Sequence, residues 1–266
     1  AVEVPGEYRG VLKRELIRLG YPVRDLAGYS QGESLPVRLR SVTANGRPFQ
    51  LRDYQRAAVD ALQDGESLHG GSGVAVLPCG AGKTMIGIAA LARWQCATLI
   101  LTANSASVRQ WRNEILDKTD LAESLVGEYN GDLKQVRPVT IATYQILTYR
   151  RNKEDRFEHM RLFQERDWGL IIYDEVHLLP APVFRATAGI QAKRRLGLTA
   201  TLVREDGMEE DVFSLVGPKL YEVGWKQLEK TGWIARVDCT EVRVPMPDSV
   251  RMEYAKAEPR HKMRIA

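Results

Sequence analysis

Short runs of apolar and β-branched residues recur along the chain, separated by segments of mixed polarity. The runs are GVAVL, TLILT, VTIAT, LIIYD and RLGLTAT, at residues 73–77, 98–102, 139–143, 170–174 and 195–201. Continuous apolar runs of this length are typical of parallel strands that are buried on both faces. The pattern therefore predicts a sheet of mainly parallel strands.

Two of the intervening segments have one apolar face. Residues 54–62 place Tyr, Ala and Leu at positions i, i+3, i+4, i+7 and i+8, and residues 108–116 follow the same spacing with Val, Trp, Ile and Leu. This spacing is that of an amphipathic helix. Strands that alternate with helices predict an α/β fold with a doubly wound sheet.

The two ends of the chain depart from this alternation. Residues 1–42 contain a basic amphipathic stretch and a Gly/Ser/Pro-rich segment, so we interpret them as a connector from an upstream module. Beyond Pro245 the chain is polar and charged and shows no strand or cap that would close a domain. We expect one α/β domain at residues 43–247, followed by a linker at 248–266. The first residue is Ala rather than Met, and we expect the chain to be a fragment or a processed form.

Composition narrows the class of protein only slightly. Lys and Arg total 38 against 34 Asp and Glu, a mild basic excess that is compatible with nucleic acid and does not require it. The three cysteines are far apart and only four histidines are present, which indicates reduced thiols and argues against a zinc site. No signal peptide or apolar run of about 18 residues is visible. We therefore expect no membrane partner and a cytoplasmic protein, nucleoid-associated in a bacterium or nuclear in a eukaryote.

The segment LPCGAGKT at residues 77–84 carries the strongest chemical signal. It follows an apolar run directly and opens a helical segment, as a phosphate-binding loop does. Glycines let successive N–H groups turn toward a polyphosphate, and the helix N-terminus adds about half a positive charge. Lys83 is expected to bind the outer phosphates and Thr84 to ligate Mg²⁺. The loop residues predicted to bind nucleotide are Pro78, Cys79, Gly80, Ala81, Gly82, Lys83 and Thr84.

This segment matches only the inner part of the GxxxxGK[ST] pattern, because Leu77 stands at the position of the first glycine. The alternative is a Gly-rich turn with an exposed lysine. We prefer the phosphate loop, because a strand precedes the segment and a helix follows it.

A second candidate site is the DEVH sequence at the end of the run at residues 170–174. Asp174 is expected to hold Mg²⁺ mostly through water, and Glu175 to act as the base that orients the attacking water. An Asp-Glu pair after a strand is also a common helix N-cap. Its place about ninety residues after a phosphate loop, on the same predicted sheet, favours catalysis.

The order and wording of these motifs resemble the first RecA-like domain of superfamily 2 helicases, and most closely the XPB family. The resemblance runs from about Arg47 to Met246. It implies an ATP-dependent DNA helicase or translocase that moves 3′ to 5′ in DNA repair or transcription-linked opening. In such an enzyme Lys83, Asp174 and Glu175 are catalytic, with ATP and Mg²⁺ bound. DNA is then gripped without regard to sequence, as a single strand or at a duplex junction.

The resemblance also assigns residues around the nucleotide. The segment FQLRDYQ, at residues 49–55, is similar to the family segment that recognises adenine, here through Arg52 and Gln55. The alternative is a helix start with ordinary surface residues, which competes more strongly for Arg52 than for Gln55.

Two further segments, at residues 101–111 and 141–145, resemble the strand-end loops that grip the nucleic-acid backbone. Hydroxyls, amides and an arginine near a helix N-terminus suit phosphate contacts that read no base. The alternative is that Ser105 or Ser107 caps the helix. The DNA contacts predicted here are Ser107, Arg109, Thr143 and Gln145.

The LTAT segment at residues 198–201 is similar to the family motif that couples the nucleotide state to DNA binding. The Arg-Glu-Asp triplet at residues 204–206 follows it and is similar to an XPB signature associated with strand opening. The alternatives are buried threonines with satisfied hydrogen bonds and a solvated charged turn. The coupling and DNA-contact residues predicted here are His177, Thr199, Thr201, Arg204, Glu205 and Asp206.

The later helicase motifs have no counterpart after Pro245. We therefore expect a second RecA-like domain downstream in the same protein, and a repair partner such as a nuclease. The isolated chain should be nearly inactive. The alternatives are the motor of a restriction or remodelling translocase and, for the isolated chain, a nucleotide- and DNA-binding module without hydrolysis.

Overall fold

A computed structural model describes residues 12, 16, 30–64, 71–152, 157–180, 183, 192–201, 212, 215–236, 240, 242 and 248–256. The chain divides into two compact units, Ala1–Ile234 and Ala235–Ala266. In the second unit the structure describes the helix α10 (Asp248–Lys256). All other elements below belong to the first unit. Within the described ranges, no helix has the length and apolar character that crossing a bilayer requires.

One parallel sheet forms the centre of the first unit. Its seven strands follow the order β3-β4-β2-β5-β6-β1-β7, and every neighbouring pair is parallel. This confirms the predicted α/β fold with a doubly wound sheet. The strands are β1 (Gly73–Val76), β2 (Thr98–Thr102), β3 (Val126–Tyr129), β4 (Val139–Thr143), β5 (Leu170–Asp174), β6 (Arg194–Thr199) and β7 (Lys219–Glu222).

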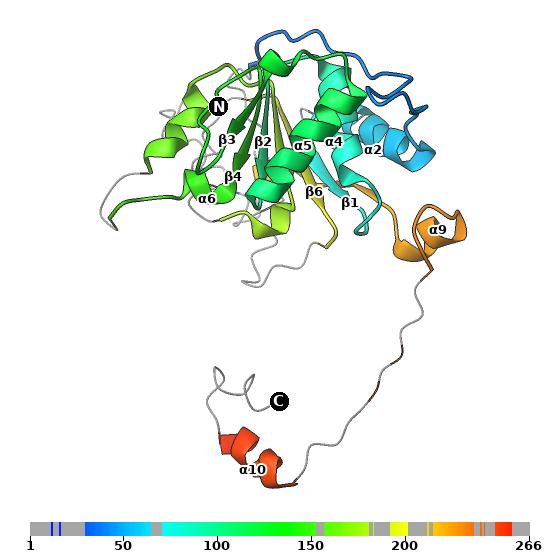
Figure 1. The fold of residues 1–266 in the computed structure, drawn as a ribbon, viewed down its shortest axis with the longest axis vertical. Coiled ribbons are helices and arrows are strands. Elements are labelled where there is room, and N and C mark those ends of the chain that lie inside the picture. The colour runs from blue at the N-terminus through cyan, green and yellow to red at the C-terminus, as the bar shows by residue number, and fades with distance from the viewer. Residues whose placement is uncertain are drawn as a thin grey trace. The chain divides into compact units, whose positions relative to one another are not determined.

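Helices cover one face of this sheet (Figure 1). The helices α4 (Lys83–Trp94) and α5 (Ser105–Lys118) cross in front of the strands, and α2 (Asp53–Asp64) packs beside α4. Short elements complete the unit: α6 (Tyr144–Leu147), α9 (Trp225–Lys230) and the 3₁₀ segments η2 (Glu123–Leu125), η3 (Glu158–Gln164) and η4 (Val176–Leu178).

Both faces of the sheet are buried, which explains the continuous apolar runs. Successive side chains of a strand point to opposite faces. In β1, Ala75 packs with the helices α2, α4 and α5, whereas Val74 and Val76 pack in a second core that contains Trp168 and Tyr173. A strand inside such a sheet needs apolar residues at every position.

Residues 30–52 run along the first unit before α2 begins. The Leu35 N–H donates to Gln95 O at 2.8 Å, and the Ala97 N–H donates to Glu33 O at 2.7 Å. Leu35 and Val37 are buried in the core beneath α4. Apolar residues of the predicted connector therefore pack on the domain, while the boundary at residue 42 stays a prediction.

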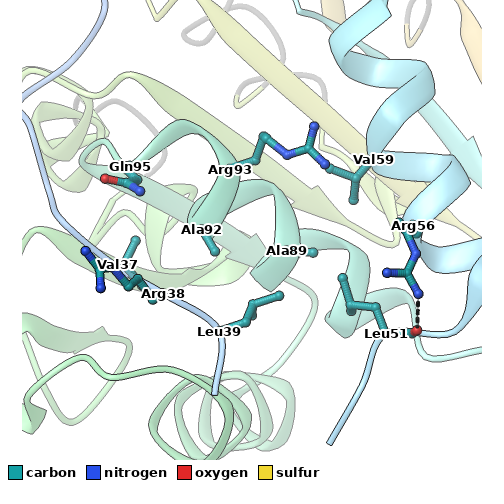
Figure 2. Close-up of a pocket in the computed structure, with 10 residues that line it drawn as sticks. All are labelled: Val37, Arg38, Leu39, Leu51, Arg56, Val59, Ala89, Ala92, Arg93 and Gln95. Atoms are coloured by element: carbon teal, nitrogen blue, oxygen red, sulfur yellow. Dashed lines mark hydrogen bonds between the residues drawn. The ribbon is translucent and has the colours of Figure 1, made fainter. Parts of the chain in front are cut away.

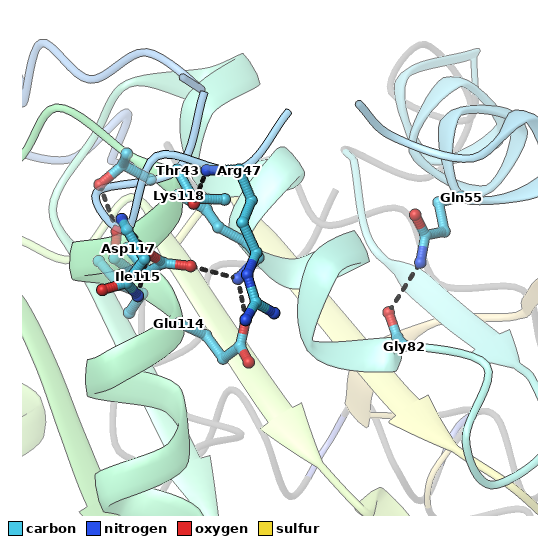
Figure 3. A network of polar contacts seen from close by, with 10 residues as sticks. Thr43, Arg47, Gln55, Gly82, Glu114, Ile115, Asp117 and Lys118 are labelled. Atoms are coloured by element: carbon cyan, nitrogen blue, oxygen red, sulfur yellow. Dashed lines mark hydrogen bonds and ion pairs between the residues drawn. The ribbon is translucent and has the colours of Figure 1, made fainter. Parts of the chain in front are cut away.

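A polar network joins this segment to the end of α5 (Figure 3). The Ala44 N–H donates to Asp117 O at 2.8 Å. Lys118 Nζ lies 2.8 Å from Glu114 Oε2 and 2.7 Å from Asp117 Oδ2. The hydrogen bond from Lys118 lowers the pKa of Asp117. The network fixes the approach of the chain to α2.

A groove of about 420 Å³ lies between this segment and the helices α2 and α4 (Figure 2). Arg56, on its wall, donates to Leu51 O at 3.1 Å. The lining residues are Val37, Arg38, Leu39, Leu51, Arg56, Val59, Ala89, Ala92, Arg93 and Gln95, none of which belongs to the glycine-rich loop before α4.

Candidate nucleotide-binding site

The predicted site residues follow the carboxyl ends of neighbouring strands. Val76 at the end of β1 pairs with Thr199 of β6, and Leu198 pairs with Asp174 of β5. The Leu77 N–H donates to Thr199 O at 2.9 Å, so the loop leaves β1 beside the end of β6. In open α/β sheets this edge is where ligands bind.

The loop between β1 and α4 has the backbone that a phosphate site requires. Gly80 and Gly82 have φ angles of 78° and 74°, in the left-handed region that favours glycine. A Cβ at Gly82 would also lie 2.7 Å from Gln55 Nε2, whereas one at Gly80 would meet nothing within 4 Å. Cys79 and Gly80 are exposed and α4 begins at Lys83. The loop thus presents its tip and a helix N-terminus to an anion.

Lys83 and Glu175 face each other across the edge of the sheet. Lys83 Nζ lies 3.1 Å from Glu175 Oε1, and the Lys83 side chain is 11% exposed. Glu175 occupies the N-cap position of η4 with a φ of 50°, but its side chain makes no cap hydrogen bond and faces Lys83 instead. A non-glycine residue in this conformation costs about 1–3 kcal/mol and is frequent at functional sites. The predicted loop and acidic pair are therefore brought together.

The Asp174 carboxylate accepts a hydrogen bond from a buried tryptophan. Trp111 Nε1 donates to Asp174 Oδ2 at 2.8 Å, and Tyr144 Oη donates to Asp174 O at 3.0 Å. Burial raises the pKa of Asp174, while the Trp111 hydrogen bond and the charge of Lys83 act in the opposite direction. The sequence placed Trp111 on an apolar helix face. Its indole N–H, which needs a partner when buried, was the available signal for this contact.

The DEVH and LTAT segments are in direct contact. His177 Nδ1 lies 2.9 Å from Thr199 Oγ1 and 3.5 Å from Glu175 Oε2. The Thr199 hydroxyl donates to Thr201 O, and the Thr201 N–H donates to Thr199 Oγ1 at 3.2 Å. Thr199 is fully buried, so it is a satisfied core residue and also a link between the two segments. Its role in coupling stays a prediction.

The residues predicted to recognise adenine lie against the loop. Gln55 Nε2 donates to Ala81 O at 3.2 Å and to Gly82 O at 3.4 Å (Figure 3). Tyr54 Oη donates to the same Ala81 O at 2.7 Å and accepts from Arg52 Nη1 at 2.9 Å. Sequence reasoning missed Tyr54, because its place on the apolar face of α2 predicted a core residue only.

The predicted DNA contacts at residues 107–145 lie at the same edge, after β2 and β4. Arg109 and Gln145 are exposed. Ser107 is not the cap of α5, and neither is Ser105, because Asn104 Oδ1 accepts the Ser107 N–H at 2.9 Å.

Thr143 has a structural role already. It is buried, and its Oγ1 accepts the Ile146 N–H at 3.2 Å as the cap of α6. The triplet Arg204, Glu205 and Asp206 lies outside the described residues. DNA contact by these residues stays a prediction.

The donor set fits Mg²⁺ better than a transition metal. Where the structure describes the chain, no cluster of three or more His, Cys, Asp and Glu could hold a metal ion. Mg²⁺ needs no such cluster, because it is usually held by one or two protein oxygens, phosphates and water. Asp174 ends β5 and Thr84 lies in the first turn of α4, both beside the loop.

The seven-stranded parallel sheet has the fold of RecA-like helicase domains, with the glycine-rich loop and the acidic pair at one edge. Residues 48–204 match the family "Type III restriction enzyme, res subunit". The chain belongs to this family.

Two relatives refine this assignment. The "DNA 3'-5' helicase XPB" of Mycobacterium tuberculosis is 56% identical over 97% of this chain and 45% of the relative. The "General transcription and DNA repair factor IIH helicase/translocase subunit XPB/SSL2" of Saccharomyces cerevisiae is 35% identical over 98% of this chain and 31% of the relative. The chain therefore spans less than half of each relative. These matches confirm the resemblance to XPB-type helicases.

The fold is similar to that of the UvsW helicase from Bacteriophage T4. The TM-score is 0.53 at 17% identity, over 82% of this chain and 79% of that structure.

Proposed function

We propose that this chain is the ATP-binding half of an XPB-type, ATP-dependent DNA helicase or translocase. The observation that carries the proposal is the 3.1 Å contact between Lys83 Nζ and Glu175 Oε1, next to Asp174 and the loop before α4. A lysine, two carboxylates and a glycine-rich loop at one sheet edge are the parts that phosphoryl transfer from ATP needs. The restriction-motor alternative is not favoured, because the relative at 56% identity is named a helicase.

Each group has a task that its position permits. Lys83 binds the outer phosphates together with the N–H groups of the loop. Glu175 then accepts a hydrogen bond from the attacking water and aligns it with the γ-phosphate. Thr84 and Asp174 would hold Mg²⁺, which neutralises phosphate charge when it is bound. Lys83 contacts Glu175, so phosphates that bind at the loop compete with this carboxylate for the lysine.

Efficient hydrolysis needs a further positive charge on the far side of the γ-phosphate. An arginine finger contributes about 10³- to 10⁵-fold in related NTPases, or roughly 4–7 kcal/mol of barrier. We assign this arginine to a second RecA-like domain of the complete protein, since both reported relatives are more than twice as long as the segment matched. Residues 1–266 alone should bind ATP, hydrolyse it only in traces and fail to unwind DNA.

DNA is the proposed track, with movement 3′ to 5′ as the name of the mycobacterial relative states. The exposed Arg109 and Gln145 lie after β2 and β4, where they can contact the sugar-phosphate backbone. The same proposal includes a role in DNA repair or transcription and a nuclease as the class of partner. It also places the protein with DNA, in the cytoplasm or the nucleus.

A fluorescent ATP analogue tests the nucleotide site directly. We expect the chain to bind Mg²⁺ with this analogue, and Lys83→Ala to lose binding at least about tenfold, because the lysine is the main charge on the outer phosphates. Circular dichroism should be unchanged, because Lys83 is not among the residues of either hydrophobic core. Equal affinity of the two well-folded proteins would contradict the assignment of the loop.

A further inference from the structure

We propose that Trp233 is a positioning residue for the base of the bound nucleotide. Its ring holds the guanidinium of Arg52 from one side, so that the guanidinium can stack on a nucleobase with the side that faces away from the indole. The inference rests on the proposed function, because a nucleotide must occupy the loop.

The Arg52 guanidinium makes two contacts, one with the Trp233 ring and one with Tyr54, which links it to the loop. Arg52 Cζ lies 4.5 Å from the centroid of the Trp233 ring. Arg52 Nη1 donates to Tyr54 Oη at 2.9 Å, and Tyr54 Oη donates to Ala81 O at 2.7 Å. The guanidinium is therefore connected to the loop backbone through one hydroxyl and lies over an indole ring.

The backbone of Trp233 is anchored while its side chain stays at the surface. The Trp233 N–H donates to Leu228 O at 3.0 Å, and Leu228 and Ile234 are buried in the core with α2. The Trp233 residue itself is 47% exposed. Within the part of the chain that the structure describes, the cation over its ring is Arg52. A large ring that is left half in solvent and covered by one arginine is better explained by that arginine than by core packing.

The chemistry favours a base as the third member of this stack. A guanidinium is planar and weakly hydrated, and it stacks on aromatic faces as well as forming hydrogen bonds. Without Trp233, the long Arg52 side chain would sample many rotamers, and stacking on a base would have to restrict them. The indole therefore lowers the entropic cost of base recognition without contacting the base.

Calorimetric titration of the full chain can separate the base from the phosphates. Mg²⁺ with ATP and Mg²⁺ with inorganic tripolyphosphate are the two probes. Trp233→Ala should weaken ATP binding about 4- to 12-fold, which corresponds to the ~0.8–1.5 kcal/mol cost of immobilising one long side chain on binding, and leave tripolyphosphate binding unchanged. Trp233→Phe should retain ATP affinity within about threefold, because a flat ring remains.

Two controls make the result specific. Trp225 of α9 is 38% exposed, and Trp225→Ala should change neither affinity. In an Arg52→Ala background, Trp233→Ala should have no further effect, because Trp233 acts through Arg52.

Unchanged ATP affinity of Trp233→Ala, additive losses in the double variant, or equal loss of both ligands would each overturn the inference. The last result would indicate a purely structural ring. The proposed function fails in a different way, namely if the unmodified chain binds neither ATP nor tripolyphosphate.

Discussion

Gly87→Ala should destabilise the protein, although glycine-to-alanine changes inside helices usually stabilise. Gly87 lies in the middle of α4, where alanine would contribute about 0.8–1 kcal/mol from helix propensity. A Cβ at this position would lie 2.4 Å from Trp111 Cη2 and 3.0 Å from Trp111 Cζ3. The Trp111 ring is buried and fixed through its N–H on Asp174, so it has little room to move.

The loss of stability can be estimated from the overpacking of the Trp111 ring and the loss of its hydrogen bond to Asp174. Overpacking in a tight core costs about 1–3 kcal/mol, and loss of a hydrogen bond to a charged group about 1.5–3 kcal/mol. After the gain in helix propensity, the free energy of unfolding should fall by about 1.5–5 kcal/mol. For a domain of this size that lowers Tm by roughly 3–20 °C.

Thermal unfolding followed by circular dichroism measures this change. Gly131→Ala is the matched control, because a Cβ at Gly131 would meet nothing within 4 Å. Its Tm should equal or slightly exceed that of the unmodified chain. If Gly87→Ala unfolded at the same temperature as the control, the close packing of Trp111 on α4 would be wrong.

The remaining predictions concern single side chains. Glu175→Gln, in the complete motor, should retain ATP binding and lose hydrolysis by at least about 10²-fold, because the amide keeps the shape and removes the base; normal turnover in a phosphate-release assay would reduce Glu175 to a structural role. Burial raises the pKa of the Cys96 thiol to about 11, so at pH 8 about one thiol in a thousand is ionised. Mass spectrometry should therefore find the exposed Cys79 alkylated before Cys96, and protected by ATP, whereas labelling of Cys96 as fast as Cys79 would contradict its burial. Arg109→Ala should weaken DNA binding about equally for all sequences and reduce its salt dependence, as fluorescence anisotropy at several salt concentrations can show; loss for one sequence alone would mean that Arg109 reads bases.

The central strands could be predicted because each contains a run of mostly apolar and β-branched residues. The strands β2, β4 and β5 occupy the predicted residues without change. The edge strands β3 and β7 were missed, because VGEY and KLYE carry charged residues that an edge tolerates. Sequence periodicity detects burial on both faces and is weak where one side of a strand lacks a neighbour.

The site was predictable where chemistry is local and hidden where it depends on tertiary contact. The glycines and the lysine of the loop before α4 are close together in the sequence, and so are the Asp and Glu at the end of β5. Both motifs can therefore be recognised from the sequence alone. Trp111 contacts Asp174 only because α5 packs over β5, far away in sequence. The Arg52–Trp233 pair likewise joins two residues that are far apart in the sequence, and no short motif encodes it.

The order of the strands has a consequence for how this protein is made. The loop follows β1, yet β1 pairs with β6 and β7, both of which lie far downstream in the chain. During synthesis β1 emerges early and must wait for residues 194–222 before it gains a neighbour on either side. Closing such a long loop is entropically costly and slow. Until then the nascent chain exposes an unpaired apolar strand, and interruption of translation before β6 leaves a product that cannot build the loop at all.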